Sequence, residues 1–288
     1  MKVRQKLCAW SSLVIYFDRR HMMNIFILTK QVPNTDKIKI DPVKNTLIRD
    51  GVESILNPYD ASALEKALKI KDKNPETKIY AISMGPKQAA DMLQACVAVG
   101  CDDAFLITDR KFGGSDTLAT SYILANAIRY VEAKVGKADI VFAGKQAIDG
   151  DTAQVGPEVA EDLDIPQITY ANEIEVSEGK VRVHREWDDA IQVVEASMPV
   201  LITFNKDEEL RFPHLRDKRH SLNFEVKEVT YEDMPQIDES VIGLKGSPTR
   251  VRKSYPASLV KDGTIIQGKD VDEAVDELVE ALEKAKLF

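Results

Sequence analysis

Glycine stands next to small polar residues in three loops that each follow an apolar run, a composition suited to binding phosphate. The strongest is the stretch 144–158, GKQAIDGDTAQVGPE, which follows an apolar run ending at Ala143. Gly150 permits a tight turn and Pro157 suits the first turn of a helix. Free backbone N–H groups and the positive end of a helix dipole can then converge on a phosphate. An ordinary capped loop between a strand and a helix is the competing interpretation.

A second loop, residues 113–122, places two glycines ahead of several hydroxyl side chains. Ser115, Thr117 and Thr120 can present hydrogen-bond donors along one edge of a polar ring or a phosphate. Ser115 or Asp116 also suits the N-cap of the following helix, and that role is compatible with ligand binding. The third loop, residues 83–86, is a weaker candidate because Gly-Pro commonly starts a loop.

Composition argues against several other functions. The net charge of −8 and the isoelectric point near 5.2 predict no broad surface for nucleic acid. Three scattered cysteines and four histidines show neither a CxxC pair nor ligand spacing, so we expect no disulfide framework and no structural metal. No Ser/His/Asp or Cys/His arrangement is evident, and no phosphate loop ends in Lys-Ser or Lys-Thr.

The first 22 residues differ in composition from the rest of the chain. Their apolar run, Cys8 to Phe17, is too short to span a bilayer, and the Asp-Arg-Arg-His that follows does not resemble a signal-peptide cleavage site. We interpret residues 1–22 as a disordered leader or an over-extended start, with the working protein beginning near Met23. No membrane span is expected.

From Met23 onward, short apolar runs alternate with helical periodicity, which predicts an α/β fold with parallel strands and crossover helices. Cys96 is expected in the core. A small hairpin or excursion over residues 37–48 turns at Asp41-Pro42. Strands are expected at 24–28, 78–84, 103–108 and 140–143, and helices after Asn57, between 87 and 99, and over 117–135.

After Pro166 the pattern predicts antiparallel strands at 174–176, 180–185 and 192–194, and then a buried strand over 199–204. Residues 205–258 are polar and punctuated by proline, which indicates an arm or loop system more than a core. A last amphipathic helix covers about 271–286, and its apolar stripe packs on its own domain or on a partner. We therefore divide the chain into a leader (1–22), an α/β domain with the candidate phosphate-binding loops (23–204) and an arm with its helix (205–288).

GKQAIDGDTAQVGPE closely resembles the nucleotide-binding segment of electron transfer flavoprotein β subunits. ILTKQVP, NPYDASALEKAL and SMGP occur in that family's order and spacing, so the resemblance covers the chain from Met23 to its end. It implies a Rossmann-like (adenine nucleotide alpha hydrolase-like) parallel sheet flanked by helices, with a β-hairpin excursion and an extended C-terminal arm ending in a helix. It also implies these nucleotide contacts: Leu28, Asn57, Met84, Asp149, Asp151, Thr152, Ala153, Gln154, Val155 and Gly156.

Two further stretches, GGSDTLATSY and GLKGSPTRV (243–251), resemble the FAD-binding, electron-bifurcating branch of the family. This resemblance implies FAD more than AMP as the cofactor, with Thr117 and Thr120 near its isoalloxazine ring. It implies a cytoplasmic subunit that oxidises NADH at its FAD, beside a larger flavin-bearing α subunit. Electrons then pass to ferredoxin and, through the α flavin, to an acyl-CoA dehydrogenase. The alternatives are a non-bifurcating β subunit with structural AMP, and a non-redox nucleotide-binding module, for which the long arm is unnecessary.

The stretch 210–219, LRFPHLRDKR, resembles the family's recognition loop, in which a leucine anchors a partner dehydrogenase. Leu215 is the matching leucine. The residues that follow, from Asp217 to Ser221, depart from the family's usual Gly-Ile-Met-Lys-like run. A solvated basic loop without a partner is therefore the alternative.

Overall fold

The structure, a computed structural model, describes residues 22–34, 39–40, 47–48, 53–250, 263, 265–266 and 270–287. Most of the expected leader, the expected turn at Asp41-Pro42 and the end of the 243–251 stretch lie outside these residues. The chain divides into a main unit, within 1–39 and 48–252, and a second unit, within 40–47 and 253–288.

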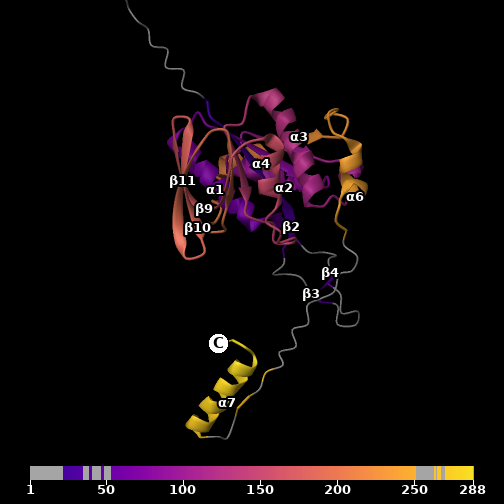
Figure 1. Cartoon of the computed structure of the whole chain (residues 1–288). Coiled ribbons are helices and arrows are strands. Elements are labelled where there is room, and N and C mark those ends of the chain that lie inside the picture. The colour runs from indigo at the N-terminus through magenta and orange to yellow at the C-terminus, as the bar shows by residue number, and fades with distance from the viewer. Residues whose placement is uncertain are drawn as a thin grey trace, which may run out of the picture. The chain divides into compact units, whose positions relative to one another are not determined.

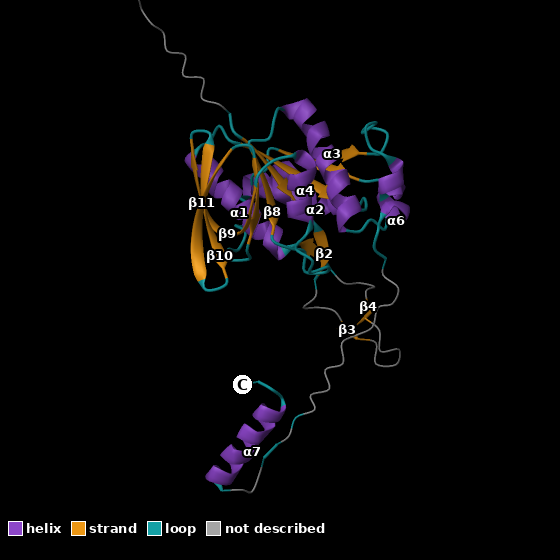
Figure 2. Cartoon of the chain, in the orientation of Figure 1, coloured by secondary structure: helices purple, strands orange, loops and turns teal. Residues whose placement is uncertain are grey.

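The main unit is built on one nine-stranded sheet with the strand order β11-β10-β9-β12-β8-β1-β6-β7-β13 (Figures 1 and 2). All neighbours from β9 to β13 pair in parallel, and β10 and β11 add an antiparallel hairpin at one edge. The predicted α/β fold with a parallel sheet is confirmed. The strands are β1 (Asn24–Leu28), β6 (Lys78–Met84), β7 (Asp103–Ile107), β8 (Ile140–Gly144), β9 (Gln167–Ser177), β10 (Lys180–Trp187), β11 (Ala190–Ser197), β12 (Val200–Phe204) and β13 (Lys227–Val229).

Helices cover both faces of the sheet because its central strands are apolar on both sides. In β1, Ile25 and Ile27 face the layer of α1 and α2, whereas Phe26 and Leu28 face the layer of α3 and α4. Cys96 is buried in the first layer, as expected. The helices are α1 (Pro58–Lys73), α2 (Ala89–Val99), α3 (Thr117–Val135) and α4 (Val155–Leu163).

The order of the central strands fixes where a ligand can bind. From β1 the chain moves through α1 to β6 and through α2 to β7, and then returns through α3 to β8 on the other side of β1. The direction in which successive strands are added to the sheet thus reverses between β1 and β8. In open α/β sheets the crevice beyond the carboxyl ends of such strands is the usual ligand site.

The segment 205–250 contributes more to the core than the sequence suggests. β13 extends the sheet by pairing with β7, and Val229, Met234, Ile237 and Ile242 are buried in the α3–α4 layer. The interpretation of this whole stretch as arm or loop is therefore wrong for residues 227–242. Its short helices are α5 (Leu215–Ser221), η3 (Glu239–Val241) and α6 (Gly243–Gly246), and η2 (Arg110–Phe112) follows β7.

Two small strand pairs belong to the excursion between β1 and α1. β2 (Gln31–Pro33) and β5 (Ser54–Leu56) pair antiparallel, and β3 (Lys39–Ile40) pairs with β4 (Leu47–Ile48), where a hairpin was expected. In the second unit, α7 (Val271–Lys284) is the expected amphipathic helix, and four of its apolar residues are exposed: Val271, Val275, Leu278 and Val279. None of the described helices combines the length and the apolar content needed to cross a bilayer.

Candidate functional site

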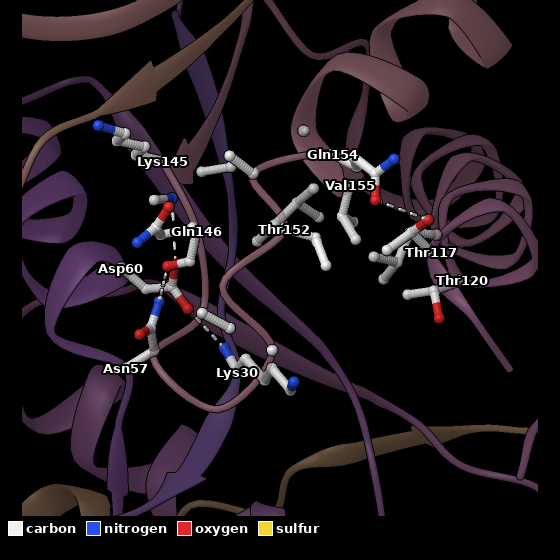
Figure 3. Close-up of a pocket in the computed structure, with 18 of the residues that line it drawn as sticks. Lys30, Asn57, Asp60, Thr117, Thr120, Lys145, Gln146, Thr152, Gln154 and Val155 are labelled. Atoms are coloured by element: carbon white, nitrogen blue, oxygen red, sulfur yellow. Dashed lines mark hydrogen bonds between the residues drawn. The ribbon is translucent and has the colours of Figure 1, made fainter. Parts of the chain in front are cut away.

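A cavity of about 360 Å³ opens at the carboxyl ends of β1, β6 and β8, where the order of strand addition reverses (Figure 3). Its size falls within the range of about 300–1,000 Å³ that is common for small-molecule sites. One wall comes from the start of α1 and the loop after β8, and the other from the N-terminal turn of α3. The sheet's topology therefore places a pocket where ligands usually bind.

The loop from Gly144 to α4 supplies backbone donors to this pocket. Asp151 and Ala153 adopt left-handed conformations with φ of 58° and 54°. The backbone amides of residues 152–156 donate to no acceptor in the described part of the chain. Unsatisfied amides at a helix N-terminus attract anions. Gly150 lies in the turn but has no left-handed φ, so the special backbone positions are Asp151 and Ala153.

Asn57 fixes this loop from the side of α1. Its side chain donates to the Gln146 carbonyl at 2.8 Å and accepts from the Ile148 amide at 3.3 Å. Asn57 stands at the N-cap position of α1 but makes no capping hydrogen bond with its side chain. A further link is the ion pair between Lys30 and Asp149, with a distance of 2.7 Å from Nζ to Oδ1.

Asp60 is a buried carboxyl at the base of the pocket. It accepts the backbone amide of Lys30 at 2.8 Å and that of Gly144 at 3.0 Å. Burial raises its pKa to about 7, although hydrogen bonds from Asn57 and the two amides act in the opposite direction. A Cβ on Gly144 would lie 2.4 Å from Asp60 Oδ1, so only glycine permits this approach.

The opposite end of the pocket is formed where α3 begins. Asp116 caps the helix by accepting the Ala119 amide at 3.1 Å, as expected, and it also accepts the amide and the hydroxyl of Thr249. Ser115 Oγ accepts the Gly243 amide at 3.0 Å. These bonds attach the segment 243–249 to the start of the helix that carries Thr117 and Thr120, both of which line the pocket.

Every expected site residue lines the pocket except Asp149, which forms an ion pair with the pocket residue Lys30. Sequence reasoning did not assign Lys30, Asp60 or Lys145 to the site, although all three line it. Lys30 and Asp60 fall inside the quoted stretches ILTKQVP and NPYDASALEKAL. Lys30 follows the first strand and Asp60 lies at the start of the first helix. Because ligands bind where strands end and helices begin, these positions could have identified both residues.

The pocket lining suits binding and orientation. It combines backbone donors, hydroxyls, two lysines and an apolar wall from Leu28, Met84 and Leu124. Lys145 places its ammonium 4.7 Å from the ring centre of Tyr170, a cation–π contact, and has no carboxylate partner among the described residues. The lining includes no histidine or cysteine. Such a surface can hold an anionic group at one end and a polar ring at the other.

A parallel α/β sheet with this pocket at its reversal point defines a ligand-binding α/β protein. Residues 44–221 match the family model described as the electron transfer flavoprotein domain. A Megasphaera elsdenii protein named electron transfer flavoprotein subunit beta is 48% identical over 271 residues, covering 92% of this chain and 100% of the relative. The chain therefore belongs to the electron transfer flavoprotein β subunit family.

Two other relatives carry names that describe enzyme complexes. One is the caffeyl-CoA reductase-Etf complex subunit CarD of Acetobacterium woodii, 44% identical over 92% of this chain and 100% of its own length. The other is the acryloyl-CoA reductase electron transfer subunit gamma of Anaerotignum propionicum, 42% identical over 90% of this chain and 98% of its own length.

Proposed function

We propose that this chain is the β subunit of an electron-bifurcating electron transfer flavoprotein, and that its pocket holds FAD and receives the hydride of NADH. The observation that carries the proposal is the reach of one continuous pocket, from the open amides of residues 152–156 to the hydroxyls of Thr117 and Thr120. An AMP would use only the first end. FAD requires donors for a diphosphate and, separately, for a polar ring.

The described residues fit FAD at each part of the molecule. The amides of residues 152–156 would hold the diphosphate, and Lys145 adds a cation without a carboxylate partner on the same wall. Thr117 and Thr120 would face the isoalloxazine ring, whose heteroatoms accept hydrogen bonds. FAD would supply the hydride and electron chemistry itself, and the protein would bind and orient it.

The segment 243–249 closes the pocket at its ring end in this proposal. Four hydrogen bonds hold the segment to Ser115 and Asp116. Gly243 donates to Ser115, Thr249 donates twice to the Asp116 carboxylate, and the Asp116 amide donates to Ser247. A Cβ on Gly243 would lie 2.2 Å from the Lys111 carbonyl oxygen, so the contact requires glycine. The segment would exclude water from the ring and keep Thr117 in place.

We propose that an α subunit with its own flavin binds the arm and its helix, which are residues 205–288. The support is the apolar stripe of α7, in which Val271, Val275, Leu278 and Val279 are exposed. An amphipathic helix gains stability by burying such a stripe. Electrons would leave the β pocket toward ferredoxin and, through the α flavin, toward the dehydrogenase.

The proposed docking loop for an acyl-CoA dehydrogenase comprises residues 210–219. Phe212 is 95% exposed and Leu215 is 85% exposed, although both are large and apolar. The loop is firmly rooted, because the Arg211 guanidinium binds both Glu65 and Asp72 of α1 at 2.8 Å. The names of the two acyl-CoA reductase relatives agree with a partner of this class.

Cofactor analysis of the heterodimer tests the proposal. The chain is co-expressed with its α subunit, and the nucleotides released from the purified complex are separated and quantified. We expect two FAD per heterodimer, and the β-bound FAD to be reduced by NADH. One FAD and one AMP would overturn bifurcation while leaving family membership intact.

A substitution pair tests the docking loop. Leu215→Ala is expected to raise the KM for the dehydrogenase while NADH reduction of the FAD is unchanged. Leu222→Ala, at an exposed leucine just after α5, serves as the matched control. Equal KM values for the two variants would contradict Leu215 as the anchor.

A further inference from the structure

A row of polar side chains runs between α3 and α4, starting at the pocket. Thr117 and Ser121 are four residues apart on α3, and Gln154, Glu158 and Asp162 are four apart along the loop and α4. Residues with this spacing share one helix face. The two helices pack together, and Thr117 and Gln154 line the pocket (Figure 3).

The row contains two carboxyl groups with unsatisfied oxygens. The Thr117 hydroxyl lies 3.4 Å from Glu158 Oε1, within reach to donate a hydrogen bond. Glu158 Oε2 and Asp162 Oδ2 are both buried, with no hydrogen-bond partner in the described part of the chain. A buried carboxyl oxygen without a donor is less costly when the group carries a proton. The row therefore favours protonated carboxyls.

Ser121 lies near both carboxyls, and its oxygen can accept a hydrogen bond from either one when that carboxyl is protonated. It is fully buried, and its own hydroxyl proton goes to the Leu118 carbonyl at 2.8 Å. The Ser121 hydroxyl also interacts with the carboxyls of both Glu158 and Asp162. Since its proton is already donated, its oxygen lone pairs are available as acceptors.

The charges around the row agree with this geometry. Burial raises the pKa of Glu158, and the negative charges of Asp116 and Asp162 add to the effect, whereas the nearby hydroxyls of Thr117 and Ser121 act in the opposite direction. Burial also raises the pKa of Asp162, helped by Glu161 and opposed by Ser121 and the cation of Arg129. Asp162 is half-buried, and its backbone carbonyl accepts from the exposed Arg129.

A redox site fed by hydride has to dispose of a proton. Each NADH that becomes NAD⁺ delivers two electrons and one proton, because the C–H bond at the nicotinamide breaks with both electrons on the hydrogen. When the two electrons move on to separate one-electron acceptors, the proton remains at the site. One proton per NADH therefore has to reach solvent.

We propose that this proton leaves through the α3–α4 row. Asp162 releases a proton to solvent beside Arg129, and Glu158 replaces it through Ser121, whose hydroxyl turns from the Leu118 carbonyl, gives its own proton to Asp162 and accepts one from Glu158. The Thr117 hydroxyl then gives its proton to Glu158 and takes up the proton left at the site. The inference rests on the proposed function, since it requires a hydride-accepting FAD in the pocket. Glu158 acts through the Thr117 hydroxyl and does not itself contact the FAD. The chemistry calls for a group that takes up and returns one proton per turnover, and a buried carboxyl beside a hydroxyl can do so.

The test uses the complete heterodimer in three forms besides wild type: Glu158→Gln, Asp162→Asn and the control Glu161→Gln. Glu161 is exposed on the same helix, so its substitution changes the same charge without entering the row. FAD content is measured first. A wild-type complex without β-bound FAD would contradict the proposed function before the proton route is tested. Failure of the proposed function is thereby distinguished from failure of the proton route.

The complex is then mixed in a stopped-flow instrument with NADH and acceptors in weak buffer containing a pH indicator. We expect unchanged hydride transfer and a release of the proton that is slowed by about 10²-fold in Glu158→Gln. Asp162→Asn should slow proton release in the same way. It provides the measurement if Glu158→Gln does not fold. Glu161→Gln should behave as wild type.

A second readout does not depend on turnover. Infrared difference spectra of the resting complex with isotope-labelled glutamate should show a carboxyl band that titrates above the ordinary glutamate range and is missing in Glu158→Gln. Proton release at the wild-type rate in both row variants, or an equal slowing in Glu161→Gln, would overturn the proposal.

Discussion

Replacing Gly144 by alanine should damage the protein and its pocket together. The added Cβ would lie 2.4 Å from Asp60 Oδ1, 2.6 Å from Tyr59 Cβ and 2.8 Å from the Asp60 backbone nitrogen. Tyr59 Cβ and the Asp60 nitrogen cannot move without the backbone of α1. The start of α1 would therefore have to move away from β8. Overpacking of this kind costs about 1–3 kcal/mol. Loss of the hydrogen bond from the Gly144 amide to Asp60 adds about 1 kcal/mol.

We therefore expect Gly144→Ala to lower the free energy of unfolding by about 2–4 kcal/mol, the sum of these two effects. Urea denaturation measures the change, with an unchanged slope indicating that stability alone has shifted. Isothermal titration with FAD should show weakened binding, because Asp60 and Asn57 hold the pocket wall together.

Gly150 provides the matched control in the same loop. A Cβ at Gly150 meets no heavy atom within 4 Å, and its φ is not left-handed. Gly150→Ala should change stability by less than about 0.5 kcal/mol, as surface substitutions usually do. Equal destabilisation of the two variants would refute the steric reasoning.

Three further outcomes can be checked. Arg211→Ala leaves the Glu65 carboxylate, 8% exposed, without its partner and should cost about 3 kcal/mol in urea unfolding; Lys87→Ala, from an exposed pair, should cost less than about 0.5 kcal/mol. Asp102 is half-buried beside two lysines, and hydrogen bonds from these lysines and from the Ile79 amide outweigh burial and lower its pKa below 3.8. Its contribution is present above pH 3.8 and is lost as pH falls below that value, so the stability deficit of Asp102→Asn at pH 7, about 2 kcal/mol, should shrink in acid. Carbon-13 NMR of labelled aspartates should show Asp60 titrating near pH 7. Because its pKa is raised, its contribution to stability is largest below pH 3.8 and is lost as pH rises to about 7; a titration near 4 would contradict this.

The sequence predicted the central strands and helices well. β1, β6 and α3 have the expected bounds, because their apolar runs or helical periodicity are strong and the flanking residues Gly85 and Asp116 mark the ends. β9 is longer than expected, since its first half pairs in parallel with β12 and lacks the alternating pattern of a hairpin.

β13 could not be found in the same way. It has three residues and its pairing partner β7 lies more than a hundred positions earlier in the chain, so local sequence carries little information about it. Lys30 and Asp60 were missed for a related reason. Their roles depend on contacts between the ends of separate elements, and a lysine or aspartate in isolation is usually a solvated surface residue.

The stretch 212–222, in which Phe212, Leu215 and Leu222 are exposed, begins and ends at fixed points of the fold. Before it, Arg211 is bound to α1, and after it, the Phe224 carbonyl accepts from Gln94 of α2 and β13 enters the sheet. Lengthening a loop between fixed ends costs only about 0.6 kcal/mol for each doubling of its length. Substitutions or insertions in this stretch can therefore change the surface it presents, while the pocket at the other end of α1 keeps its structure.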